Sequence, residues 1–162
     1  MNVKLDMKGV DQLMKQLSKM PEKVQKDSYR KVVLPHAIEV QEKMRSFIRD
    51  SKQTHKRYKA GKVIATYEPG NLRRSIKVRR KKKDGKTLIG PTALKKGKAN
   101  GTYSGKRVDA YYASFVNNGT RFMRNNPSKG YAEKTYDWAR NNVTPRLIKS
   151  LGDYIIKHAG NV

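Results

Sequence analysis

The sequence predicts an α+β domain, in which a small, mostly antiparallel sheet is packed by several amphipathic helices. Residues 2–8 alternate apolar and polar side chains, which predicts a short N-terminal strand. The pair Asp84-Gly85 separates two further strand-like segments and predicts a basic β-hairpin. Most of the remaining chain carries apolar residues three or four positions apart, which is the spacing of a helix with one buried face.

The N-terminal helices are predicted from two apolar stripes. The first lies within residues 10–19, and Pro21 is placed to begin a second helix that carries the stripe of residues 33–48. Pro35 interrupts that stripe, because proline has no backbone N–H to donate within the helix. We therefore expect a kink or a break near Leu34.

The hairpin around Asp84-Gly85 has an apolar face and a basic face. A two-residue turn there places Arg80 opposite Ile89. Because side chains alternate along a strand, Ile76, Val78 and Ile89 can be buried together while basic side chains occupy the other face. The basic residues in and beside this hairpin, which we predict to contact a partner, are Arg73, Arg74, Lys77, Arg79, Arg80, Lys81, Lys82 and Lys83.

Two further segments, residues 51–69 and 94–108, are rich in basic residues and show no sustained period. We expect both to be long basic loops, the second an insertion, within a single domain that spans residues 1–162.

The C-terminal part predicts three helices. In the first, residues 110–118, we expect Tyr112, Phe115 and Val116 to face inward, and Gly119 to end the helix in the left-handed region. The other two are predicted over residues 131–141 and from Thr144-Pro145 onward, where a capping residue is followed by a proline.

The positive charge is concentrated in the middle of the chain. Of a net charge of +25, residues 52–107 carry +17, since 19 Lys and Arg face two acids there, whereas each flanking segment carries +4. Such a field attracts polyanions or acidic protein surfaces over a Debye length of about 8–10 Å. Nucleic acid and acidic protein both remain open as partners, although no motif for sequence-specific reading of nucleic acid is present.

The sequence shows no pattern that is typical of catalysis or of a metal site. It has no cysteine, and His36, His55 and His158 have no partner at metal-ligand spacing, so we expect neither enzymatic activity nor a cofactor. No apolar run reaches the about 20 residues that span a bilayer, and the first residues lack the apolar block of a secretory signal. We therefore expect a protein that is made in a cytosol and does not enter a membrane.

Three motifs occur in a characteristic order and spacing: GNLRRSI at residues 70–76, IGP at 89–91 and YASFVNNGT at 112–120. Together they resemble the tail-completion or neck proteins of long-tailed bacteriophages, which join heads to tails. The family pattern has a Glu and an aromatic residue where this chain has Asn117 and Asn118.

The resemblance implies a non-enzymatic virion protein, assembled in the host bacterial cytoplasm, that forms a ring of about six copies at the head–tail junction. The implied partners are other copies of the chain, a head-completion or adaptor protein, a tail terminator or tail-tube protein, and genomic DNA in the channel. The basic hairpin would face that DNA or an acidic protein. The implied interface residues are Tyr112, Phe115, Asn117, Gly119 and Thr120.

Two alternatives stay open. Gly119 and Thr120 could serve only to end a helix. The charge alone is also compatible with a free basic protein that binds nucleic acid through nonspecific phosphate contacts.

Overall fold

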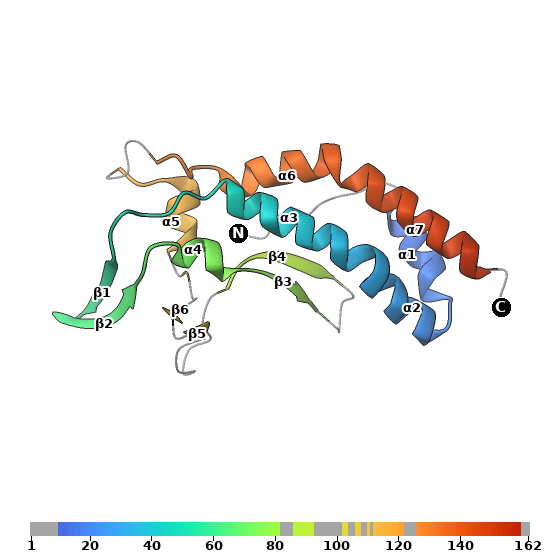
Figure 1. Cartoon of the computed structure of the whole chain (residues 1–162), viewed down its shortest axis with the longest axis horizontal. Coiled ribbons are helices and arrows are strands. Elements are labelled where there is room, and N and C mark those ends of the chain that lie inside the picture. The colour runs from blue at the N-terminus through green and yellow to red at the C-terminus, as the bar shows by residue number, and fades with distance from the viewer. Residues whose placement is uncertain are drawn as a thin grey trace. The chain divides into compact units, whose positions relative to one another are not determined.

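The computed structural model describes residues 10–81, 86–92, 102–103, 106–107, 110, 112–121 and 126–159, and these residues form an α+β fold as predicted (Figure 1). The strand expected at residues 2–8 and the turn expected at Asp84-Gly85 lie outside them. Contacts along the chain define two compact units, which we call the central unit (residues 41–132) and the helical unit (residues 2–40 and 133–162). That residues 1–162 form a single domain stays a prediction.

The helical unit has its own core, in which α7 packs against α1, α2 and the π-helical turn η1. Leu17, Val32, Leu151 and Ile155 are buried in it. They come from apolar stripes at helical spacing, so the amphipathic pattern of the sequence finds its buried face here. The elements that lie wholly in this unit are α1 (Val10–Ser18), α2 (Glu22–Ser28), η1 (Tyr29–Val33) and α7 (Thr144–Ala159). Part of α3 (Leu34–Ser46) and most of α6 (Tyr131–Asn142) belong to it as well.

The break predicted near Leu34 is the π-helical turn η1, which separates α2 from α3. The backbone N–H of Leu34 donates to the carbonyl of Tyr29, five residues earlier. Pro35 follows at once and cannot donate a hydrogen bond, so the regular pattern of α-helical bonds cannot run through this point. The interruption is confirmed at the predicted place.

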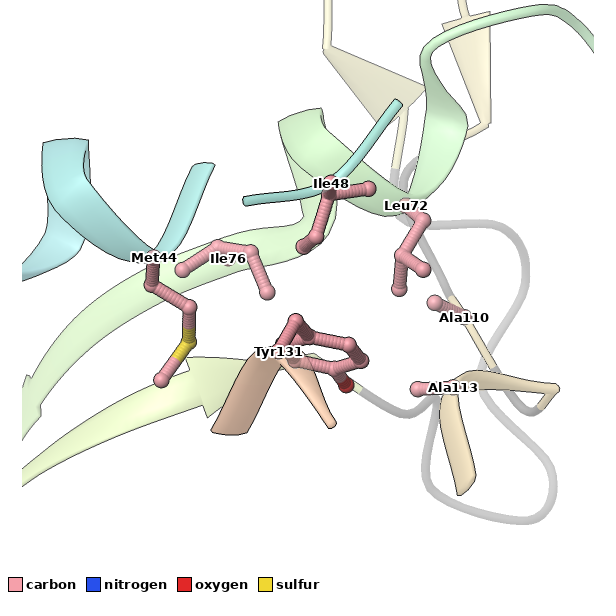
Figure 2. Close-up of a cluster of buried hydrophobic side chains, with 7 residues drawn as sticks. All are labelled: Met44, Ile48, Leu72, Ile76, Ala110, Ala113 and Tyr131. Atoms are coloured by element: carbon pink, nitrogen blue, oxygen red, sulfur yellow. The ribbon is translucent and has the colours of Figure 1, made fainter. Parts of the chain in front are cut away.

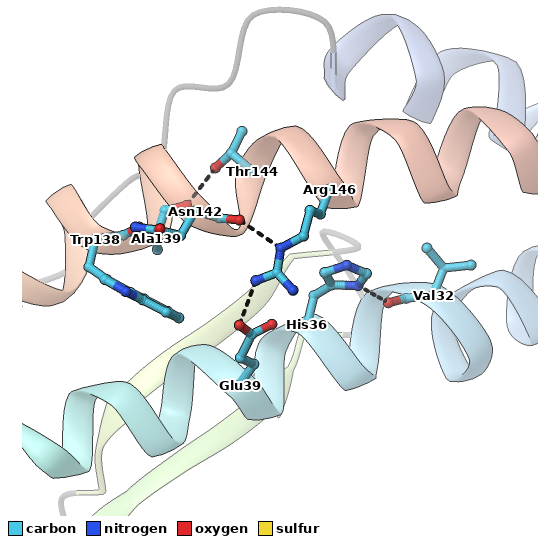
Figure 3. Close-up of polar contacts among 8 residues, drawn as sticks. All are labelled: Val32, His36, Glu39, Trp138, Ala139, Asn142, Thr144 and Arg146. Carbon is cyan, nitrogen blue, oxygen red and sulfur yellow. Dashed lines mark hydrogen bonds and ion pairs between the residues drawn. The ribbon is translucent and has the colours of Figure 1, made fainter.

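Polar side chains of the helical unit are used within and between its helices (Figure 3). Arg146 on α7 donates to Glu39 on α3 at 2.5 Å and to the carbonyl of Asn142 at 2.8 Å. His36 on α3 donates from Nδ1 to the carbonyl of Val32 on η1, four residues earlier, at 2.8 Å. The same contact recurs at the end of α7, where the Nδ1 of His158 donates to the carbonyl of Tyr154.

The central unit is built around a buried cluster to which helices and strands both contribute. Figure 2 shows the side chains of this cluster, with Ile76 fully buried among them. Burying an isoleucine of this size stabilises a fold by about 1.5–3 kcal/mol. The buried members are Met44, Ile48, Leu72, Ile76, Ala110, Ala113 and Tyr131. They come from α3 and the residues after it, α4 (Asn71–Ser75), β3 (Ile76–Arg80), the segment leading into α5 (Ala113–Asn118), and the start of α6.

The predicted basic hairpin exists, but its register differs from the prediction. Strands β3 and β4 (Thr87–Pro91) pair antiparallel, with Arg80 opposite Thr87 rather than Ile89. The pairing continues to Lys81, whose N–H donates to the carbonyl of Lys86 at 2.8 Å. The register therefore differs from the one that a two-residue turn at Asp84-Gly85 would give. Because this shifts the pairing by two positions, side chains keep their faces; Val78 and Ile89 share a face as predicted and now lie directly opposite each other.

The expectation of a loop over residues 51–69 is wrong for most of that segment. β1 (His55–Lys59) and β2 (Lys62–Tyr67) form an antiparallel hairpin. Its turn residues Ala60 and Gly61 have φ of 48° and 74°, as a type I′ turn requires. The register shifts between Arg57 and Tyr58, and such a bulge interrupts the alternation by which a strand is recognised in sequence. Within the second expected loop, residues 102–103 (β5) pair with residues 106–107 (β6).

Helix α5 is shorter than predicted, and one of its three predicted inward residues is exposed. It begins at Ala113, and its buried residues are Ala113 and Asn117, while Phe115 is 53% exposed. The expectation that Phe115 faces inward is therefore wrong. Tyr112 and Val116 are half-buried and pack against the core cluster, as predicted. Asn117 is buried on the same side, where its side chain accepts a hydrogen bond from the start of α6.

Candidate interaction surfaces

A cavity of about 390 Å³ in the central unit is lined by charged side chains from α3, α4 and β3, and we call it the basic cavity. Its lining residues are Glu42, Arg45, Arg73, Arg74 and Lys77. Four bases face a single acid there, so the cavity favours an anion. Three of the four bases were predicted as contact residues from the sequence.

Arg45 was missed by the sequence reasoning, because it lies on α3 far from the hairpin in the chain. It donates from Nη2 to the carbonyl of Ile76 at 3.0 Å, and from Nη1 to Glu42 at 2.6 Å. Gln41, one helical turn earlier, donates to the same carbonyl at 2.7 Å. The spacing of four residues between Gln41 and Arg45 does predict that both side chains lie on the same face of their helix. They do not tell which strand carbonyl that face meets.

Arg73 and Arg74 are neighbours in α4 with different surroundings. Arg73 is exposed and forms an ion pair with Asp50 at 3.0 Å, the kind of surface pair that contributes little to stability. Arg74 is half-buried, and its Nη1 donates to the carbonyl of Pro69 at 2.8 Å. A Cβ at Gly70 would come within 2.8 Å of that nitrogen, so glycine is needed for this close approach.

Three nitrogens of the basic cavity's arginines are buried and have no hydrogen-bond acceptor among the residues that the structure describes. They are Nε of Arg45 and both Nε and Nη2 of Arg74. Buried donors are nearly always paired in folded proteins, so these three unpaired nitrogens at one cavity are unusual.

Of the remaining predicted bases, Arg79 and Arg80 lie on β3 and Lys81 follows directly after it. Arg79, Arg80 and Lys81 are exposed, and Arg79 donates to the carbonyl of Pro91 at 3.1 Å. Lys82 and Lys83 lie outside the described residues. The structure thus brings Arg73, Arg74 and Lys77 to one cavity and leaves the outer bases on the solvated end of the strand.

A second cavity of the central unit, of about 350 Å³, is lined in part by aromatic side chains, and we call it the aromatic cavity. Tyr67 and Tyr112 meet edge to face with centroids 5.4 Å apart, and Asn71 donates to the Tyr112 hydroxyl at 3.0 Å. Phe115 also lines this cavity. Two of the predicted interface residues, Tyr112 and Phe115, are therefore brought together here.

Asn117, another predicted interface residue, serves inside the unit. It is 5% exposed, and its Oδ1 accepts a hydrogen bond from the N–H of Ala132 at 2.9 Å. Its carbonyl accepts a bond from the N–H of Gly130 at 2.8 Å. The first N–H groups of a helix have no partner within the helix, so Asn117 caps α6 from a distant part of the chain.

Gly119 ends α5 at a positive φ, as predicted, but not in the left-handed helical region. Its φ of 76° and ψ of 169° describe a conformation that is essentially restricted to glycine. Thr120 follows it and is half-buried. A role of either residue in a subunit interface stays a prediction.

Within the described ranges, no group of three or more acidic or histidine side chains could hold a metal ion. Over the same residues, none of the helices is both long and apolar enough to cross a membrane.

Comparison with known protein families identifies the family of this chain. The family model described as "Bacteriophage HK97-gp10, putative tail-component" matches residues 11–119, about two thirds of the sequence. The chain belongs to this family. The matched range includes all the residues that line the basic and the aromatic cavity. No curated protein and no solved structure matched the chain.

Membership in the HK97-gp10-like family confirms the kind of family that the three sequence motifs predicted. The protein is a bacteriophage tail component with a structural role in the virion.

Proposed function

We propose that this tail component joins the phage head to the tail, without catalysing a reaction, as a ring of about six copies. In this arrangement it lies between a head-completion or adaptor protein on one side and a tail terminator or tail-tube protein on the other. The proposal is supported by the family match over residues 11–119. This range includes all three motifs of the neck-protein pattern, apart from Thr120 at the end of the third motif.

The charge of the chain supports a location between other components. Copies that each carry +25 repel one another when they are brought together in a closed ring. Compensation has to come from DNA in the channel or from acidic neighbouring rings. The basic cavity and the exposed bases Arg79, Arg80 and Lys81 are the surfaces proposed for these contacts.

Two measurements test the proposal. Mass photometry and electron microscopy of the purified chain, alone and mixed with neighbouring tail components, should show rings or co-assembly. A phage that lacks the gene should accumulate unjoined heads and tails, and the supplied protein should restore infectious particles. Complete, infectious particles formed without the protein would overturn the proposal.

The net charge of +25 is also compatible with a second function, that of a free nucleic-acid-binding protein. In that case the chain should remain monomeric or dimeric and bind duplex DNA below about 1 μM near physiological salt, with a steep salt dependence. Under head–tail joining, we expect weak nonspecific binding of DNA by the isolated chain.

The outer bases can be tested with matched charge changes. Arg80→Glu with Lys81→Glu should impair the joining of heads to tails while the chain stays folded, since both side chains are exposed. Lys149→Glu with Lys157→Glu makes the same charge change at exposed positions of α7 and should have a smaller effect. Equal loss of joining by both pairs would indicate a general charge effect instead of a contact at β3.

A further inference from the structure

We infer that the basic cavity receives one acidic side chain, an Asp or a Glu, of a neighbouring virion protein, and that Arg74 is its principal donor. The inference rests on the proposed function, because it gives the chemistry of one contact made when the protein joins its neighbours.

Buried arginine nitrogens of the basic cavity have no acceptor among the described residues. Arg74 has Nε and Nη2 without an acceptor in the described part of the chain, and Arg45 has Nε in the same condition. Both side chains line the basic cavity. A buried charged donor without a partner destabilises the free chain, because its desolvation is not compensated by a hydrogen bond. An acceptor supplied by a neighbouring protein on assembly would remove this destabilisation.

The free edge of Arg74 matches a carboxylate. Nε and Nη2 lie on the same edge of the planar guanidinium, and their two N–H groups point in parallel. A carboxylate can accept both at once, which is the strongest and most specific hydrogen-bonded pair that arginine forms. Nη1 is already held by the carbonyl of Pro69 at 2.8 Å, so the orientation of the plane is set before the partner arrives.

Other side chains of the cavity are held in place around this edge. Arg45 is held by Glu42 and by the carbonyl of Ile76, with hydrogen bonds of 2.6 and 3.0 Å. A binding site whose donors are already ordered loses less conformational freedom when the ligand enters. Because the free nitrogens are covered in the isolated chain, the entering carboxylate has to displace the atoms that cover them.

A protein carboxylate fits these features better than the backbone of DNA. The donors are recessed in a cavity whose wall includes the carboxylate of Glu42, which repels a run of phosphates more than a single charge. A duplex presents phosphates in a continuous track, and the exposed bases Arg79, Arg80 and Lys81 provide a surface for such a track.

The test uses Arg74→Lys, which keeps the charge and removes the planar edge, with Arg80→Lys as the matched control at an exposed position of the neighbouring strand. The probes are a fluorescently labelled hexaglutamate peptide and a short DNA duplex, followed by anisotropy at low salt. We expect Arg74→Lys to weaken peptide binding roughly tenfold and Arg80→Lys to change it less than about twofold. Binding of the duplex should respond alike to both variants.

Three results would overturn the inference: no binding of the peptide by the unmodified chain, equal loss of peptide binding in both variants, or a loss of duplex binding in Arg74→Lys as large as that of peptide binding. If Arg74→Lys does not fold, NMR of the unmodified chain decides. Addition of hexaglutamate should shift the Nε–H signals of Arg74 and Arg45, and shifts confined to Arg79 and Arg80 would refute the assignment.

The outcome can be separated from that of the proposed function. Peptide binding by the isolated chain tests the cavity, whereas the phage that lacks the gene tests head–tail joining. If the chain binds hexaglutamate through Arg74 but is dispensable for joining, the proposed function is refuted. The inference that the basic cavity binds a carboxylate is then still supported.

Discussion

Replacing Asn117 with Ala tests whether this residue stabilises the fold or serves a partner. The change removes the Oδ1 that accepts the Ala132 N–H at 2.9 Å, in a position that is 5% exposed. Water cannot readily replace the lost acceptor at such a site. The loss of a helix cap and of a buried acceptor together costs about 2 kcal/mol, with a range of about 1–3 kcal/mol. For a chain of this length, that lowers the midpoint of thermal unfolding by about 4–8 °C.

The assay is thermal unfolding followed by circular dichroism, with two control variants. Asn117→Asp keeps an acceptor at the N-terminus of α6, where a negative charge is favourable, so it should recover about half of the loss or more. Ser114→Ala alters an exposed residue of the same helix α5 and should change stability by less than about 0.5 kcal/mol. If Asn117→Ala unfolds at the same temperature as the unmodified chain but fails to assemble, the side chain contacts a partner and the capping argument is refuted.

Three further predictions concern stability. Ile76→Ala should lower the free energy of unfolding by about 2–5 kcal/mol in a urea titration, since this side chain is fully buried; a loss below about 1 kcal/mol would contradict the core of Figure 2. Gly119→Ala should cost about 1–3 kcal/mol, because φ is 76° and ψ is 169°, and an unchanged midpoint would contradict that backbone. Burial raises the pKa of Tyr154, and the negative charge of Asp27 adds to this effect. The neutral phenol therefore contributes its full stabilisation below its unfolded pKa of about 10. This contribution is lost as the pH rises through the higher pKa of the folded state. The stability difference between the unmodified chain and Tyr154→Phe should therefore shift with pH above about 10, and a constant difference would contradict the assignment.

The basic hairpin shows how a local pattern can be right about faces and wrong about pairing. Alternation alone predicted that Val78 and Ile89 share a face, and they do. The register depended on the length of the connection, and the strands pair two residues farther from the turn than Asp84-Gly85 suggested. A shift of two residues leaves every side chain on its face, so the apolar pattern carries no information about it.

The basic cavity shows what the sequence could contribute to a site and what it could not. Arg73, Arg74 and Lys77 are close together in the chain, so they were found as one basic cluster. Arg45 joins them only because α3 packs on β3 and its side chain reaches the Ile76 carbonyl. Nothing in the residues around Arg45 specifies that neighbour.

What the sequence determined by itself is local: the helices with their apolar stripes, the interruption at Pro35, the positive φ of Gly119 and the concentration of charge between residues 52 and 107. These features follow from backbone sterics and from the period of burial, which act over one or two turns of chain. The tertiary structure decided the face that α5 buries, since Asn117 is drawn inward to cap a helix that begins 14 residues later in the chain. It also decided which arginines share a cavity, because such contacts depend on which distant backbone groups remain to be satisfied once the elements have packed.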